Sequence, residues 1–143
     1  MSQQYSAKTV WKGEGLNFKG IAGSGYQFDV GGGSDKIGGS PMEFLLVGVA
    51  GCTAVDVVGM LRKQRQDIAG LEVEAIGTRA DEHPMVYTDV TLIYTIRGKN
   101  VDPKAVERAI RLSEEKYCSA SAMFSRSGAQ IDTIFKIEEV EEV

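Results

Sequence analysis

The sequence predicts an α+β fold, in which one long central helix packs against antiparallel or mixed β-sheets. Three observations predict it. The first forty residues consist of short strand-like runs separated by glycines, a pattern typical of strands joined by tight turns. A long and nearly uncharged helical segment follows at residues 40–67. Beyond it come two alternating strands, a second helical segment and a last strand, and this order is that of an α+β protein.

Three short strands are expected before the central helix, at residues 5–12, 16–22 and 26–30. They contain β-branched and aromatic residues, and Tyr26, Phe28 and Val30 fall on one face of the third because side chains alternate along a strand. The glycine-rich segment at residues 31–39 is expected to be a flexible loop. It does not fit a phosphate-binding loop, because no Gly-Lys-Ser/Thr sequence follows it.

The central helix begins with a strong start signal. Ser40 and Glu43 have the spacing of a capping box around Pro41, and proline fits the first helical position, where no N–H is needed. The segment is apolar on nearly all sides up to Met60, so most of its first half must be buried. A chain of 143 residues can hardly wrap such a helix alone, and we therefore expect a homodimer in which a second subunit covers it.

The C-terminal half is expected to contain strands at residues 71–80 and 86–97, helices at 103–117 and 119–124, and a strand at 130–140. Gly70 is expected to end the central helix, and His83 and Pro84 form the loop of a hairpin. Asp102 and Pro103 give the second helix its cap and first turn. Because no linker divides the chain, we expect a single domain with N-terminal strands at 1–39, the central helix at 40–67 and C-terminal strands and helices at 70–143.

The composition and charge exclude several classes of partner and function. The net charge is −4 and basic residues form no stripe, so nucleic acid and an anionic membrane surface are poor partners. The N-terminus does not resemble a secretory signal, and the longest apolar stretch, at residues 44–55, is interrupted by Thr53 and is too short to span a bilayer. We therefore expect a cytoplasmic protein, where a cysteine pair is more often catalytic, redox-active or metal-binding than structural. One histidine and no CxxC leave a zinc site short of ligands.

The two cysteines carry the clearest chemical signal. Cys52 lies in the central helix among small residues, including Gly48, Gly51 and Gly59, which leave room for a substrate or a partner helix but cost helix stability. Cys118 stands at a helix boundary, where the helix dipole favours a thiolate. Together they suggest a thiol–disulfide cycle, although each alone is also compatible with an inert buried cysteine. Only the fold can bring them to disulfide distance.

Three segments resemble the OsmC/Ohr family of osmotically inducible and organic-hydroperoxide-resistance proteins, in its OsmC-like branch. Residues 40–58 resemble the family's nucleophile helix, residues 115–124 its second cysteine motif, and residues 81–94 its hairpin. The resemblance implies an intertwined homodimer with its two sites at the subunit interface. It also implies a thiol peroxidase, in which Cys52 attacks the peroxide oxygen and becomes a sulfenic acid. Cys118 then condenses with it to a disulfide, and an external dithiol, rather than a bound cofactor, reduces that disulfide.

Four residues are candidates for supporting roles. Family members typically carry a glutamate directly after the proline of the long helix, but Met42 stands there and Glu43 comes one residue later, half a turn away from Cys52. The family's N-terminal arginine is also missing, and Lys12 or Lys19 would replace it only as a point charge, without the arginine fork. Arg126 and His83 are the other two candidates, each equally explained by a solvated or structural role. Asp56, one turn after Cys52, is left without a role.

Two further functions stay open at this point. The missing glutamate–arginine pair favours a dimeric, redox-sensitive protein that binds a small apolar ligand beside Cys52 without peroxidase turnover. A cysteine acyl-transfer enzyme that uses His83 is the third hypothesis, because a Cys–His pair suits acyl transfer.

Overall fold

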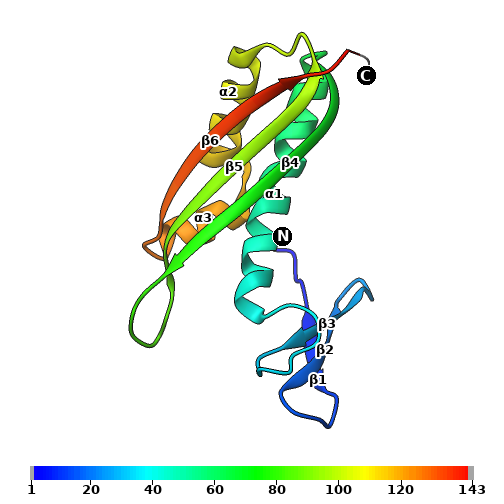
Figure 1. Ribbon diagram of the computed structural model, residues 1–143, viewed down its shortest axis with the longest axis vertical. Helices are drawn as coiled ribbons and strands as arrows, with labels where there is room; N and C mark the ends of the chain where they lie inside the picture. Colours follow the sequence, from blue (N-terminus) through cyan, green and yellow to red (C-terminus); the bar gives the residue numbers. More distant parts are fainter. Residues whose placement is uncertain (1, 142–143) are drawn as a thin grey trace. The chain divides into compact units, whose positions relative to one another are not determined.

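The computed structural model describes residues 2–141 and contains two compact units, Met1–Leu45 and Leu46–Val143. Its mixed helix and strand content, in two three-stranded sheets, confirms the predicted α+β class (Figure 1). The single domain over residues 1–143 stays a prediction.

The first unit is an antiparallel meander that ends in the start of the central helix. Strands β1 (Ala7–Trp11), β2 (Asn17–Ala22) and β3 (Gln27–Gly31) pair in chain order. Gly25, in the turn between β2 and β3, has a φ of 97°, a conformation that glycine adopts at little cost. The Phe28 ring of β3 packs on Phe44, with ring centroids 4.9 Å apart. The N-terminal half of the fold therefore follows the prediction closely.

The central helix α1 spans Pro41–Lys63, and its capping box is formed. The backbone N–H of Ser40 donates to Glu43 Oε1 at 2.9 Å, and the N–H of Glu43 donates to Ser40 Oγ at 3.2 Å. The predicted end at residue 67 is wrong. Arg65 adopts a left-handed φ of 58°, and the chain turns directly into β4, whose first residue is Asp67.

The second unit is built on a long three-stranded sheet with helices on one face (Figure 1). Strands β4 (Asp67–Arg79) and β5 (Tyr87–Lys99) form an antiparallel hairpin, and β6 (Gln130–Glu139) runs parallel to β5. The helices are α2 (Pro103–Leu112) and α3 (Ser119–Arg126), joined by the π-helix η1 (Ser113–Tyr117). The predicted helix at 103–117 therefore has the right bounds, but its last five residues form a π-helix, which the sequence did not predict.

The core of the second unit lies between β5 and the helices. Fully buried side chains come from β5, from α2 and from one face of α1: Val90, Leu92, Tyr94, Ile96, Val106, Ala109, Val49, Val57 and Leu61. The other face of α1 is open, since Val47 and Val55 are 64% and 75% exposed and nothing lies within 4 Å of a Cβ added at Gly48, Gly51 or Gly59. One chain therefore leaves much of this apolar helix uncovered, as predicted.

By length and composition α1 is also able to cross a membrane, which the apolar stretch at residues 44–55 was too short to predict. Core helices of folded domains meet the same test, and the buried face of α1 forms hydrogen bonds within its own unit through Thr53.

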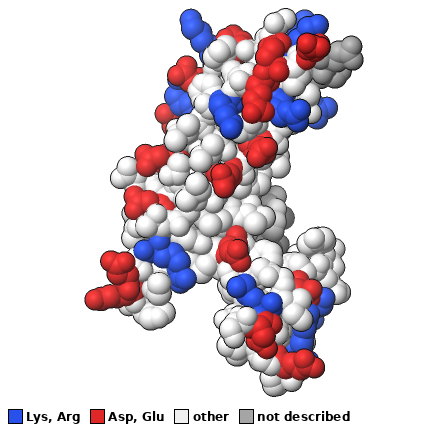
Figure 2. All heavy atoms as spheres, in the orientation of Figure 1, with Lys and Arg blue, Asp and Glu red and all other residues white. Residues whose placement is uncertain are grey.

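On the face shown in Figure 2, lysine and arginine side chains are interspersed with aspartate and glutamate.

Candidate functional site

The two cysteines meet inside the second unit. Cys52 lies in the middle of α1 and is half-buried, whereas Cys118 caps α3 and is 3% exposed. Both are free thiols, and a side-chain hydrogen bond joins them. The fold thus brings together two cysteines that are distant along the chain, which a thiol–disulfide cycle requires.

Burial controls the acidity of Cys118. Loss of solvent is the main cause that raises the pKa of its thiol to about 11; hydrogen bonds from Ser121 oppose the shift, and the neighbouring Cys52 thiol adds to it. Cys118 Sγ does accept the backbone N–H of Ser121 at the start of α3, at 3.4 Å. The prediction that the helix N-terminus makes Cys118 a thiolate is nevertheless wrong, because the desolvation cost exceeds the stabilisation by these donors. At neutral pH Cys118 is a protonated thiol.

The π-helix sets the position of Cys118. The backbone N–H of Cys118 donates to the carbonyl of Ser113 at 2.7 Å, which is the i→i−5 bond that defines a π-turn. This wide turn buries Ser113 completely and holds Glu114 half-buried on the side of the helices that faces β5. Single π-turns of this kind occur frequently at functional sites.

A polar network runs from α1 to Cys118 through the core. Thr53 Oγ1 lies 2.8 Å from both Tyr94 Oη and Ser113 Oγ, and the Ser113 hydroxyl donates to Asp56 at 2.9 Å. At the other end, Tyr94 Oη is 3.4 Å from Glu114 Oε2. The Ser121 hydroxyl donates to the same oxygen at 3.0 Å. Every buried side-chain N or O atom of the described residues has a partner.

Burial in the network raises the pKa values of two further groups, Glu114 and Tyr94. Burial raises the pKa of Glu114 above its ordinary value, and the negative charge of Asp56 adds to the shift. Burial likewise raises the pKa of Tyr94, with the charge of Glu114 acting in the same direction. Both groups therefore hold their protons more tightly than they do in water.

Sequence reasoning missed most of these residues. The network members absent from the prediction are Thr53, Tyr94, Ser113, Glu114 and Ser121. Two signals were present: Thr53 interrupts an apolar stretch directly after Cys52, and Glu114 precedes Cys118 by about one helical turn. Asp56, left without a role, proves to be one end of the network.

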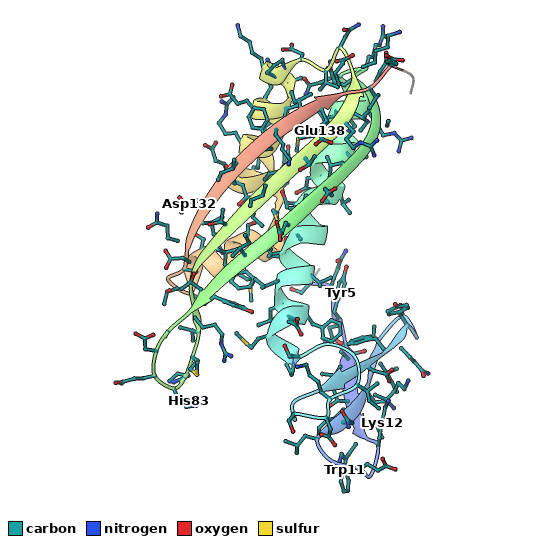
Figure 3. All side chains as sticks on the ribbon, viewed as in Figure 1. Tyr5, Trp11, Lys12, His83, Asp132 and Glu138 are labelled. Atoms are coloured by element: carbon teal, nitrogen blue, oxygen red, sulfur yellow. The ribbon has the colours of Figure 1, made fainter. Side chains whose placement is uncertain are left out.

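The four supporting candidates are divided between the two units. In the first unit, Glu43 accepts the cap hydrogen bonds from Ser40, which lower the pKa of its carboxyl. Lys12 pairs there with Asp29 (Figure 3). In the second unit, Arg126 is an exposed residue at the end of α3. His83 is exposed in the loop between β4 and β5 (Figure 3).

Two cavities open onto the network. One, of about 550 Å³, is lined by Glu114 and Ser121 together with residues of α2 and β6. The other, of about 430 Å³, is lined by Asp56 with Val55, Leu112 and Tyr117. Each carboxylate end of the network therefore borders open space. Among residues 2–141, His, Cys, Asp and Glu side chains form no cluster of three that would hold a metal ion.

Fold and site together define a class of protein: an α+β protein whose central helix presents one cysteine to a second, buried cysteine. The chain belongs to the OsmC family, since the model for OsmC-like protein matches residues 31–134. This confirms the resemblance drawn from the cysteine motifs. The chain is also 40% identical to Protein YhfA of Escherichia coli K12 over 121 residues, which make up 85% of this chain and 90% of YhfA.

Solved structures share the fold. A hypothetical protein from Aquifex aeolicus VF5 superimposes with a TM-score of 0.86 at 28% identity, covering 98% of this chain and 100% of its own. The organic hydroperoxide resistance protein OhrB of Bacillus subtilis superimposes with a TM-score of 0.68, covering 94% of this chain and 98% of its own. At 16% identity the likeness to OhrB concerns the fold alone.

Proposed function

We propose that this protein is a cysteine-based peroxidase that reduces organic hydroperoxides through a Cys52 sulfenic acid and a Cys52–Cys118 disulfide. The observation that carries the proposal is the contact between the two free thiols. Membership of the OsmC family and the fold shared with a hydroperoxide resistance protein support it. In this role the protein needs no bound cofactor.

The environments of the two thiols support different roles for them. Cys52 is the more accessible thiol and Cys118 is almost fully buried and protonated, so Cys52 is the nucleophile. Its thiolate attacks the peroxide oxygen that carries the hydrogen, the O–O bond breaks to give the Cys52 sulfenic acid, and the alkoxide that leaves takes a proton from solvent and becomes an alcohol. The Cys118 sulfur then displaces the hydroxyl of the Cys52 sulfenic acid, which leaves as water. An external dithiol reduces the disulfide and restores both thiols.

The surroundings of Cys52 favour organic substrates and a dimeric site. The open face of α1 carries Val47, Val55 and three glycines without close neighbours, so an apolar peroxide has room to approach. A second copy of this chain that covered the face would enclose the site and bury the apolar surface. We therefore propose a homodimer that acts in the cytoplasm, where dithiol reductants are available.

A thiol count tests the proposal. The reduced protein is mixed with one equivalent of cumene hydroperoxide or of hydrogen peroxide, and free thiols are followed over seconds to minutes. We expect loss of two thiols per chain, faster with the organic peroxide. Cys52→Ser removes the reaction, and Cys118→Ser leaves a sulfenic acid that a dimedone probe traps. Retention of both thiols with each peroxide would refute the peroxidase.

A second candidate function has one specific observation in its favour. The cavity beside Asp56 is lined by Val55, Met60, Leu112 and Tyr117 together with Gly59 and the charged Asp56 and Lys63, and it suits a small, partly apolar ligand held near a redox-sensitive thiol pair. Such a binding protein retains a ligand in native mass spectrometry and forms its disulfide slowly with any oxidant. Rapid and peroxide-selective thiol loss without a retained ligand contradicts it. The exposure of His83 gives no comparable support to acyl transfer.

A further inference from the structure

The polar network forms an unbroken chain of hydrogen bonds that ends at the sulfur of Cys118. Its members, in order of contact, are Asp56, Ser113, Thr53, Tyr94, Glu114, Ser121 and Cys118. Ser121 is 2% exposed. It joins the last two members, because its hydroxyl donates to Glu114 and also forms a hydrogen bond with the Cys118 thiol. Glu114 is therefore connected to a reacting sulfur through a single hydroxyl.

With both carboxylates ionised, the chain of hydrogen bonds from Asp56 to Glu114 is one proton short. Four contacts join Asp56 to Glu114 by way of Ser113, Thr53 and Tyr94. Each contact needs one proton to be a hydrogen bond, and each hydroxyl supplies only one. With both carboxylates ionised, three protons must serve four contacts, and two acceptor oxygens face each other at one of them. A proton on Glu114 completes the chain.

The charges around Glu114 favour taking up that proton. Asp56 raises its pKa from the α1 side, and burial acts in the same direction. Other titratable groups face the site from the elements packed around it: Tyr94 from β5, Cys52 from α1, Cys118 at the start of α3, and Glu107, Arg111 and Glu115 around the cavity on which Glu114 opens. Glu114 is thus a carboxylate that binds a proton inside the fold and exchanges it with water through the cavity.

We propose that Glu114 is the positioning residue for disulfide formation: through the Ser121 hydroxyl it receives the proton that Cys118 releases as its sulfur attacks Cys52. The proposal rests on the peroxidase cycle and names the base for its second step. Cys118 needs such a base because its buried thiol does not ionise at neutral pH.

Disulfide formation conserves atoms and charge. The Cys118 thiol gives its proton to Ser121 Oγ while the Ser121 hydroxyl proton moves to Glu114, so Ser121 is unchanged. The Cys118 sulfur forms the S–S bond, and the S–O bond of the Cys52 sulfenic acid breaks. The hydroxide that leaves takes a proton from solvent and becomes water. When a dithiol later opens the disulfide, the Cys118 thiolate regains its proton from Glu114 by the same route.

Ellman's reagent, an aromatic disulfide, allows the attack of Cys118 on Cys52 to be measured without a peroxide. When Ellman's disulfide reacts with Cys52, one nitrothiobenzoate is released at a rate that depends on reagent concentration. Cys118 then attacks the mixed disulfide and releases a second nitrothiobenzoate at a concentration-independent rate. This leaving group is a weak base and needs no proton, so the second phase reports how readily Cys118 loses its own. Stopped-flow absorbance measures both phases in the folded, full-length protein.

We expect Glu114→Gln to slow the second phase about 100-fold at neutral pH. In the wild type its rate rises with pH as Glu114 ionises, and Glu114→Gln removes that rise, leaving a rate proportional to hydroxide concentration. Glu114→Asp restores part of the rise. The matched control is Glu115→Gln, the same change at the neighbouring, exposed residue of the π-turn, which leaves rate and profile unchanged. An unaltered rate and profile in Glu114→Gln would overturn the proposal.

A second variant keeps the test decisive if Glu114→Gln folds poorly, as judged by circular dichroism. Ser121→Ala removes the bridging hydroxyl but keeps the backbone N–H that caps Cys118, and we expect the same loss of the pH-dependent rise. A wild-type second phase in Ser121→Ala contradicts the relay. The peroxidase itself is judged separately by sulfenic acid trapping in Cys118→Ser. Absence of sulfenic acid refutes the peroxidase, whereas the nitrothiobenzoate phases still decide the role of Glu114.

Discussion

Removing the hydroxyl of Thr53 tests whether the buried network stabilises the fold. Thr53 is fully buried, and its Oγ1 makes contacts of 2.8 Å with Tyr94 and with Ser113. In Thr53→Val both contacts are lost, but Tyr94 keeps Glu114 and Ser113 keeps Asp56. No hydroxyl is left unpaired, so the cost is that of two net hydrogen bonds. At about 1 kcal/mol each, we expect a loss of about 2 kcal/mol in the free energy of unfolding.

Urea denaturation at a fixed protein concentration measures this loss, because dimerisation would make stability depend on concentration. Thr53→Ser is the matched control, since it keeps the hydroxyl and removes one methyl group, at a cost of about 0.8 kcal/mol. Thr53→Val should therefore be clearly less stable than Thr53→Ser. Equal stability of the two variants, or a more stable valine variant, would refute a stabilising role for the network.

The remaining predictions concern the helix cap and the two shifted pKa values. Ser40→Ala should cost about 1 kcal/mol of stability by removing the α1 cap, without changing the nitrothiobenzoate phases; a change in those phases contradicts a purely structural role for Glu43 and its partner. The raised pKa of Glu114 stabilises the fold below the ordinary carboxyl value of 4.5 and loses that contribution as pH rises through the folded pKa; urea titrations should show this loss in the wild type and not in Glu114→Gln. In Cys52→Ser, iodoacetamide alkylation of Cys118 should still be rising with pH above the ordinary thiol value of 9.0, because burial, the largest cause of its raised pKa, remains; a plateau near neutral pH contradicts that burial effect.

Local signals were sufficient to predict the elements but not all their ends. The capping box at Ser40 and the proline at position 103 mark helix starts that the structure confirms, since both depend on nearby residues. The predicted end of α1 is too late because Gly70 is the clear stop signal in the sequence, whereas Arg65, which carries no turn signal, adopts the left-handed conformation. The π-turn after Leu112 likewise has no sequence signature.

The thiol pair was predicted as a possibility, and its environment was not predictable. The network between Asp56 and Cys118 joins residues from α1, β5, the π-turn and α3, so it exists only once these elements pack. The same packing reverses the expected acidity of Cys118, because a helix N-terminus can be recognised in a sequence but burial cannot. The position of Glu114 about one helical turn before Cys118 is visible in the sequence, but its burial, which separates it from the exposed Glu115, is not.

Peptide mapping by mass spectrometry after one equivalent of cumene hydroperoxide tests the central claim most directly. We predict that, within seconds to minutes, a cross-linked peptide pair appears in which Cys52 is joined to Cys118 within one chain, and that it disappears on treatment with a dithiol. Recovery of both residues as free thiols, or linkage of either one only to a cysteine of another chain, would contradict the account.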